Sequence, residues 1–266
     1  MIERRLKSAV QSAVTRFHEM AFDRGMPHKV GVYLHSLPEQ DYDSFGEMCR
    51  FFRGAGYRFR GPGEFLADAD ERCVFVSFDD NYRAWYEAMP LFESLDVRVT
   101  FYVNTCAVRE RDDPAEIEAY FDRLGFTGPR IPLSAAELVA LDDAGHTIGT
   151  HTHSHHRLTS IPYDDALADI VTGKQDLEAI LGKPVVHFAY PYGMRRHFSE
   201  ELRIACQSMG FETIANAIPG LQHAPQKPTS INRSGWDPHR PIPENLGRLS
   251  IDGQRFERRT GRSAVV

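Results

Sequence analysis

The segment from residue 73 to residue 80, CVFVSFDD, places the strongest constraint on the fold. It is apolar apart from one serine until it ends in Asp79 and Asp80. A run of this kind is typical of a strand that is covered on both faces, because a strand with one face in water alternates apolar and polar residues. The sequence therefore predicts a buried parallel strand that carries two carboxylates at its end.

Strand-like and helix-like segments alternate on both sides of this strand. The predicted strands are KVGVYLHSL, VRVTFYVNT, HTIGTH and VVHFAYPYG, and the predicted helices cover residues 45–55, 84–94, 135–145, 163–181 and 199–210. Ser134 and Glu137 form a capping box at the start of the third of these helices. Such alternation implies parallel strands joined by right-handed crossovers, and six to eight strands can close a barrel. We predict an α/β barrel.

The length of 266 residues favours one such domain with additions. Residues 1–28 form a predicted N-terminal helical extension, and residues 29–266 form the main domain. Apolar residues recur at three- and four-residue steps between residues 2 and 21, which indicates an amphipathic helix. We expect it to pack on its own domain; the alternative is a homodimer or membrane-surface contact, which Arg4, Arg5 and Lys7 would favour.

Charge and composition exclude several classes of protein. A net charge of −6 argues against nucleic-acid binding, which requires a basic face. No apolar stretch is long enough for a transmembrane span. The N-terminal residues lack the unbroken apolar core of a secretory signal, so we expect a cytoplasmic protein. The four cysteines form no C-x-x-C pair, which indicates reduced thiols.

The adjacent acids Asp79 and Asp80 are costly to bury unless a cation offsets their repulsion. A divalent metal would do so. Because neighbouring side chains of an extended segment point in opposite directions, one aspartate could bind a metal while the other faces a substrate. The alternative is that they cap the helix that follows.

Four histidines fall within residues 151–156, in the sequence HTHSHH. In an extended conformation His151, His153 and His155 would share a face, whereas in a helical turn His151 and His155 would do so. Both arrangements offer ligands, and a catalytic zinc ion typically has three protein ligands. If this run and Asp79–Asp80 lie at the carboxyl edge of one sheet, they form a candidate metal site.

The ordered motifs resemble those of the polysaccharide deacetylase family of metal-dependent carbohydrate esterases. SFDDN at residues 77–81 is similar to the family's T-F-D-D-G, HTHSH at residues 151–155 matches H-[ST]-x-x-H, and AYPYG at residues 189–193 matches R-x-P-Y-G except for the arginine. The resemblance extends from about Val30 to Arg233. It implies a distorted seven-stranded (β/α) barrel and makes residues 29–266 a catalytic domain.

The resemblance also implies a role for each matching residue. Asp80, His151 and His155 would hold a divalent metal, most simply zinc, with cobalt or nickel as alternatives. Asp79 would be the general base that takes a proton from the metal-bound water, and the backbone N–H of Tyr192 would stabilise the oxyanion.

Two departures from the family pattern leave roles to be filled. Ala189 replaces the arginine that orients the base, and we predict that Arg233, in INRSGW, supplies the missing cation. No C-terminal L-x-H motif supplies the general acid. A subgroup that resembles the poly-N-acetylglucosamine deacetylases instead begins with a strand that ends in a histidine, so we predict His35, in VYLHS, as the acid.

The remaining predictions concern the substrate. We expect Pro191, Tyr192, Arg233 and Trp236 to contact it, and we expect the reaction to be hydrolysis of the acetamide of an N-acetylated sugar or glycan intermediate. A nucleotide- or lipid-linked sugar would suit a cytoplasmic enzyme. The alternatives are a deformylase or other amidase acting on a sugar or small molecule, and a carbohydrate-binding module that has lost catalysis.

Overall fold

The computed structural model describes residues 26–108, 114–222, 227–249 and 251–260, and in this part of the chain every paired strand runs parallel to its neighbour. The strands are β1 (Lys29–Leu34), β2 (Arg58–Phe59), β3 (Cys73–Asp80), β4 (Thr100–Val103), β5 (Thr147–Thr150), β6 (His187–Ala189), β7 (Thr213–Ala215) and β8 (Ser234–Gly235). They form one curled sheet in the order β7-β6-β5-β4-β3-β1-β8, with β2 paired to β3 off this path. The predicted α/β barrel architecture is confirmed.

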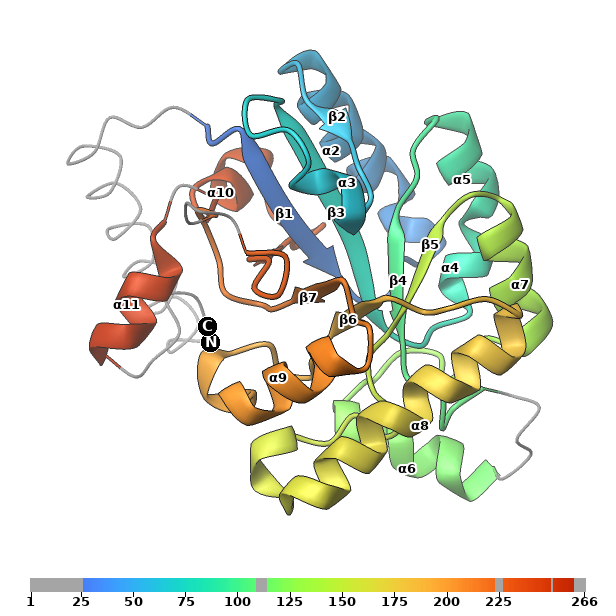
Figure 1. Ribbon diagram of the computed structural model, residues 1–266. Coiled ribbons are helices and arrows are strands. Elements are labelled where there is room, and N and C mark those ends of the chain that lie inside the picture. The colour runs from blue at the N-terminus through green and yellow to red at the C-terminus, as the bar shows by residue number, and fades with distance from the viewer. Residues whose placement is uncertain (1–25, 109–113, 223–226, 250, 261–266) are drawn as a thin grey trace, which may run out of the picture.

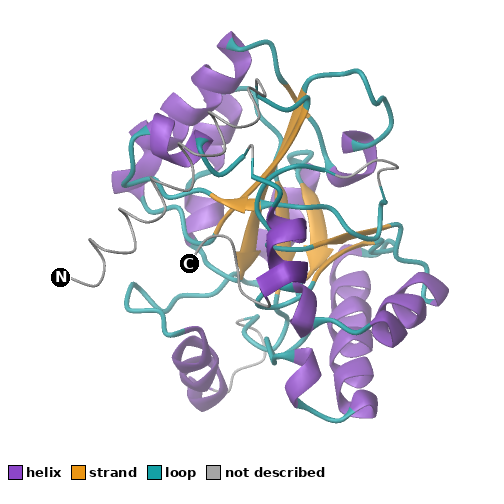
Figure 2. Cartoon of the chain, turned by 90° about the vertical axis from the view of Figure 1, so that its left-hand side faces the viewer, coloured by secondary structure: helices purple, strands orange, loops and turns teal. Residues whose placement is uncertain are grey.

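Helices surround this sheet, as Figures 1 and 2 show. The α-helices are α2 (Tyr42–Gly54), α3 (Pro62–Phe65), α4 (Ala84–Glu87), α5 (Met89–Ser94), α6 (Pro114–Leu124), α7 (Ala135–Asp143), α8 (Tyr163–Leu181), α9 (Glu200–Ser208), α10 (Ile242–Leu246) and α11 (Gly253–Thr260). Three 3₁₀ turns are η1 (Glu39–Asp41), η2 (Leu158–Ser160) and η3 (Arg195–His197). Within the described ranges, none of the helices combines the length and hydropathy that spanning a bilayer requires.

Strand β3 is buried at all eight positions, which confirms the prediction from its apolar sequence. Its core-facing Phe78 packs on Phe101 of β4, and Trp85 of α4 stacks on Phe101 with the ring centroids 5.0 Å apart. The four cysteines are free and buried. The core thus fixes β3 rigidly behind the two carboxylates that end it.

The N-terminal strand β1 lies between β3 and the C-terminal strand β8. Gly31 permits this close pairing, because a Cβ atom there would lie 2.2 Å from the carbonyl oxygen of Asn232. The register pairs Leu34 with Phe78, so His35 leaves the sheet at the same edge as Asp79. A position of His35 at this edge is what we expected if the first strand ends in the proposed general acid.

Two predictions about helices require comment. The helix predicted over residues 84–94 is divided into α4 and α5, because Pro90 lies in the first turn of α5 and cannot donate a backbone hydrogen bond. The capping box of Ser134 and Glu137 is confirmed at the start of α7. The N-terminal amphipathic helix of residues 2–21, with its contact to a partner or membrane, lies outside the described residues.

Candidate metal centre

The candidate ligands come from the carboxyl ends of neighbouring strands. In the ladder, Asp80 of β3 pairs with Val103 of β4, and Val103 pairs with Thr150 of β5. His151 follows directly, and its backbone N–H donates to the carbonyl oxygen of Val103. The parallel register therefore brings residues about seventy positions apart to one edge of the sheet.

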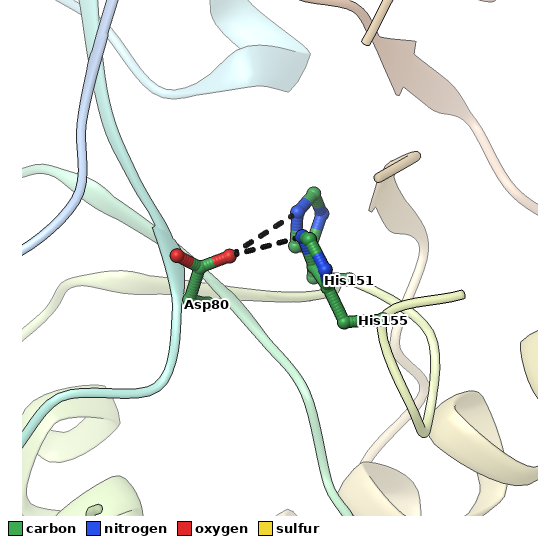
Figure 3. Close-up of side chains that lie close together, drawn as sticks. All are labelled: Asp80, His151 and His155. Carbon is green, nitrogen blue, oxygen red and sulfur yellow. Dashed lines mark ion pairs between the residues drawn. The ribbon is translucent and has the colours of Figure 1, made fainter. Parts of the chain in front are cut away.

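Figure 3 shows His151 and His155 on the same side of Asp80, with their rings turned toward its carboxylate. Asp80 Oδ1 lies 3.7 Å from His151 Nε2 and 3.3 Å from His155 Nε2. One ligand atom from each residue can be chosen so that all three lie within 4.8 Å of one another. Ligands at about 2.0–2.2 Å from a zinc ion are separated by distances of this order.

The tautomer of His151 is set by a hydrogen bond behind the ring. Its Nδ1 lies 2.6 Å from the carbonyl oxygen of Ala189. A carbonyl can only accept, so Nδ1 carries the proton and donates it. The lone pair of Nε2 is then directed at the space shared with Asp80, which is how metal-binding histidines are commonly oriented.

The electrostatics of this cluster also fit a cation. Burial lowers the pKa of both His151 and His155 to about 4, so both imidazoles are neutral at pH 7. Asp80 Oδ1 is buried and has no hydrogen-bond donor among the described residues. Two neutral nitrogens and one carboxylate oxygen without a donor suit a divalent ion such as zinc.

The backbone at the cluster adopts conformations that side chains other than glycine rarely adopt. Among the described residues, five that are not glycine have a positive φ. Four of them lie at or next to the candidate ligands: Asp80 (86°), Thr152 (71°), His155 (58°) and Tyr192 (62°). Such conformations cost about 1–3 kcal/mol each and concentrate at functional sites. Two of these four residues, Asp80 and His155, are candidate metal ligands.

Asp79, the other carboxylate of β3, points to Arg233 instead of to the histidines. The guanidinium of Arg233 donates from Nη1 to Oδ1 at 2.6 Å and from Nη2 to Oδ2 at 2.8 Å. The two aspartates therefore face different partners, as the extended-strand argument predicts. The alternative that they cap the following helix is wrong, because α4 begins after Arg83 without a side-chain cap.

Arg233 is fully buried, and each of its three guanidinium nitrogens donates a hydrogen bond. Nη1 also donates to Ser77 Oγ at 2.8 Å, and Nε donates to the carbonyl oxygen of Asn216 at 2.9 Å. Its Cζ atom also lies 5.2 Å from the centroid of the Tyr33 ring and 5.1 Å from that of Tyr102. This surrounding holds the guanidinium in one orientation.

The pKa of Asp79 reflects this pairing. Burial alone would raise the pKa of the carboxyl, but the charge of Arg233 and its hydrogen bonds outweigh burial and hold the pKa below its ordinary value. Asp79 is therefore ionised at neutral pH, although it is only 4% exposed. A base in this state can accept a proton without first losing one.

His35 and Tyr192 lie at the exposed rim. His35 follows β1 with an exposed side chain, and its carbonyl oxygen accepts a hydrogen bond from Trp85 Nε1 at 2.7 Å. Tyr192 is 41% exposed, with its ring centroid 5.1 Å from that of His155. Pro191 before it is buried.

Other predicted contacts lie elsewhere. Trp236 is only 6% exposed and packs on Phe52 in the hydrophobic core, so the structure does not place it where a sugar could stack. The only reason in the sequence to expect a substrate contact was that Trp236 is aromatic, and aromatic residues are equally typical of the core.

His153 is also not part of the ligand cluster. Its Nδ1 lies 2.8 Å from Thr105 Oγ1 and 3.2 Å from Asp176 Oδ2.

Two supporting contacts could not be found from sequence. Tyr82 donates its hydroxyl to Asp80 Oδ2 at 3.0 Å, which leaves Oδ1 for a metal. Thr105 donates to Asp176 Oδ2 at 2.6 Å and so ties the end of β4 to α8 next to the histidine loop. The first contact is made by an aspartate with a positive φ of 86°, and the second joins residues 71 positions apart.

Comparison with known proteins identifies the family and the fold. The family model described as polysaccharide deacetylase matches residues 67–214. The deacetylase PplD of Streptococcus pyogenes, solved in complex with acetate, is similar with a TM-score of 0.67 and 17% identity, over 84% of this chain and 98% of that one. IcaB from Ammonifex degensii is similar with a TM-score of 0.64 and 19% identity, over 85% and 99%. The BpsB deacetylase domain from Bordetella bronchiseptica has a TM-score of 0.62 and 16% identity, over 80% and 98%.

At these identities the structural matches show a shared fold. A search of curated proteins gives no match.

Proposed function

The chain belongs to the polysaccharide deacetylase family and is a carbohydrate-deacetylating hydrolase, and from this we propose that it removes the acetyl group from an N-acetylated sugar with the help of a divalent metal ion. One observation carries the proposal. A three-ligand cluster, Asp80, His151 and His155, lies beside a carboxylate, Asp79, that is kept ionised by a buried arginine.

The donor set favours zinc, and cobalt or nickel would also fit it. A divalent cation held by these three residues would supply Lewis acidity: it would make a water ligand acidic and polarise the carbonyl of the acetamide. The residues of the chain would orient the metal ligands, the base and the substrate. The Nδ1 hydrogen bond of His151 to Ala189, and that of Tyr82 to Asp80, hold two of the ligands in place before substrate arrives.

Asp79 is the proposed general base. The two hydrogen bonds of Arg233 fix the plane of its carboxylate and lower its pKa, so that it is ionised when substrate binds. It would take the proton of the attacking water, a role that commonly contributes 10²- to 10⁴-fold to a rate. Arg233 acts through Asp79 and is therefore a positioning residue that takes the place of the arginine missing at Ala189.

The two rim residues complete the proposed reaction. The backbone N–H of Tyr192 would donate to the oxygen of the tetrahedral intermediate, and its left-handed φ of 62° sets the direction of the flanking peptide groups. His35, exposed at the end of β1, would protonate the departing amine.

Release of acetate tests the proposal. The full chain is supplied with zinc, cobalt or nickel and incubated with chitooligosaccharides, N-acetylglucosamine glycosides and phosphorylated N-acetyl sugars, and acetate and free amine are measured together. We expect equal amounts of both products from at least one substrate. Absence of both from every substrate, in protein that contains the metal, would contradict the proposed function.

A further inference from the structure

The rim of the site carries a cluster of positive charge next to Tyr192. The guanidinium Cζ of Arg157 lies 4.8 Å from the centroid of the Tyr192 ring, and that ring is 5.1 Å from His155. Arg157 follows the histidine loop directly and is exposed. Only one aromatic ring therefore separates this guanidinium from a proposed metal ligand.

A second arginine, on another loop, is linked to Tyr192 through His197. Arg196, in η3, donates from Nε to His197 Nε2 at 3.2 Å, and the His197 ring lies 5.7 Å from the Tyr192 ring at an interplanar angle of 75°. Thr159 Oγ1 of η2 donates to the carbonyl oxygen of Arg196 at 2.9 Å and joins the two loops. Tyr192 thus lies between two arginine-bearing loops that are fixed to each other.

Both charges act on the imidazole of His197. Its pKa is lowered to about 4, chiefly by burial and in addition by the charges of Arg157 and Arg196, while a hydrogen bond with the backbone of Tyr192 acts in the opposite direction. His197 is therefore neutral and adds no third charge. One acid, Glu257 of α11, is 6% exposed and accepts the backbone N–H of Arg195 at 2.8 Å. Burial raises the pKa of Glu257, and the charges of Arg195 and Arg196 oppose that rise.

Arg157 differs from several other arginines of this protein, whose net charge is −6. Those arginines face carboxylates: Arg60 faces Glu71, Arg83 faces Glu137, Arg130 faces Glu118 and Asp122, and Arg240 faces Asp237. Arg157 forms no ion pair with any described acid and stacks on Tyr192 instead. Arg157 and Arg196 therefore both act on His197, next to Tyr192 at the exposed rim of the candidate metal centre.

We propose that Arg157 and Arg196 form a subsite for a phosphate group of the substrate, next to the acetylated sugar. A phosphate dianion neutralises two positive charges and offers enough oxygens for two guanidinium groups, whereas a carboxylate carries one charge. The inference rests on the proposed function in one respect: the sugar is the one whose acetamide reaches the metal site. The phosphate belongs to a sugar 1-phosphate or to a diphosphate-linked sugar.

Direct binding tests the subsite without any reaction. The affinity of the zinc-containing full chain is measured by calorimetry for N-acetylglucosamine 1-phosphate and for the neutral methyl glycoside of N-acetylglucosamine, in the wild type, Arg157→Gln and Arg196→Gln. Arg130→Gln is the matched control, because its ion pairs lie outside the site. Zinc content is measured in each sample, since phosphate also binds metal ions.

We expect each rim substitution to weaken phosphate-ester binding about 10- to 100-fold, the range typical of a charged hydrogen bond, with zinc content unchanged. In each rim variant, the affinity for the neutral glycoside should stay within about twofold of the wild-type value. In Arg130→Gln, the affinities for both ligands should do so. Unchanged affinity for the phosphate ester in both rim variants would overturn the proposal, as would an equal loss for the neutral glycoside.

Turnover separates this inference from the proposed function. If kcat/KM for the phosphorylated sugar exceeds that for the neutral one, and only the former falls in Arg157→Gln and Arg196→Gln, both hold. If no substrate is deacetylated while the arginines still select the phosphate ester in binding, the proposed function fails and the subsite stands. A nucleoside diphosphate sugar and a prenyl diphosphate sugar, compared with the 1-phosphate, identify which source of phosphate is preferred.

Discussion

Arg233 binds both carboxylate oxygens of Asp79, at 2.6 and 2.8 Å, although 154 residues separate the two in the sequence. Arg233 is fully buried, and Asp79 is 4% exposed. A buried charge without its partner costs about 3–5 kcal/mol, so neither residue can be changed alone without consequence. The pair explains how a base next to a candidate metal ligand stays ionised and fixed in orientation.

Replacement of Arg233 should change the pH dependence of the reaction. Because Arg233 lowers the pKa of Asp79 and burial raises it, loss of the guanidinium raises that pKa. Asp79 is then protonated over a wider range of pH, and the acidic limb of kcat/KM moves to higher pH. Arg233→Lys retains the charge without the two parallel bonds, so we expect a smaller shift than in Arg233→Ala.

The control for this prediction is folding, since Arg233 also bonds Ser77 and Asn216. Circular dichroism and zinc content identify samples that are folded and loaded. An Arg233→Ala enzyme that is folded, with undiminished kcat and an unmoved acidic limb, would remove Arg233 from the mechanism.

His35 should matter only when the leaving group needs a proton. We expect His35→Gln to lower kcat/KM for an N-acetyl sugar by about 100-fold or more, because the amine must be protonated as it departs. An aryl acetate has a leaving group that departs as an anion, so its hydrolysis should fall far less. Equal losses on both substrates would show that His35 does not act as the acid.

Gly173 on α8 should control the position of the histidine loop. A Cβ atom at this residue would lie 2.6 Å from the Thr152 carbonyl carbon and 2.8 Å from the His153 nitrogen. Gly173→Ala should therefore destabilise the fold by about 1–3 kcal/mol and weaken zinc binding, because it displaces the backbone between His151 and His155.

The matched control is Gly54→Ala at the end of α2, where an added Cβ atom meets nothing within 4 Å. It should be neutral or stabilising by up to about 1 kcal/mol. Denaturant unfolding and zinc titration measure both effects. Tight zinc binding in Gly173→Ala, equal to that of Gly54→Ala, would contradict the close packing of α8 on the loop.

His146 should make the fold sensitive to acid. Burial lowers its pKa to about 4, and its Nδ1 accepts the backbone N–H of Val99 at 3.2 Å. In the unfolded chain the pKa is about 6.5, so the unfolded state takes up a proton first. The resulting stability is complete above about pH 6.5 and is lost as the pH falls toward 4, by up to about 3 kcal/mol.

The variant that isolates this effect is His146→Gln, whose side-chain oxygen can accept the Val99 N–H without titrating. Other buried histidines titrate in both proteins, so the difference between the two unfolding curves is the measured quantity. We expect the wild type to lose more stability than the variant between pH 6.5 and pH 4. Parallel curves would contradict a neutral, buried His146.

Much of this architecture was predictable from local sequence. The apolar run of β3, the alternation of strands and helices and the capping box of Ser134 are short-range patterns, and each was found in the structure. The spacing of the histidines left His153 open as a third ligand, and the resemblance to the family selected His151 and His155, which the structure brings together with Asp80. Pro90 was visible in the sequence and should have divided the helix predicted there.

The remaining features depend on tertiary contacts that no local pattern encodes. The positive φ of Asp80 and Tyr192, and the arginines that meet at Tyr192, arise only when separate loops pack together. For Trp236 the prediction from the sequence was wrong. We expected this aromatic residue to contact substrate, and it is part of the core.

Metal content and acetate release, measured together in two variants, test the central claim most directly. Asp79→Asn should retain one metal ion per chain and lose about 100- to 10,000-fold in acetate release, because the base is gone while the ligands remain. Asp80→Asn should lose both the metal and the activity. An Asp79→Asn protein that contains metal and releases acetate at the wild-type rate would contradict the account.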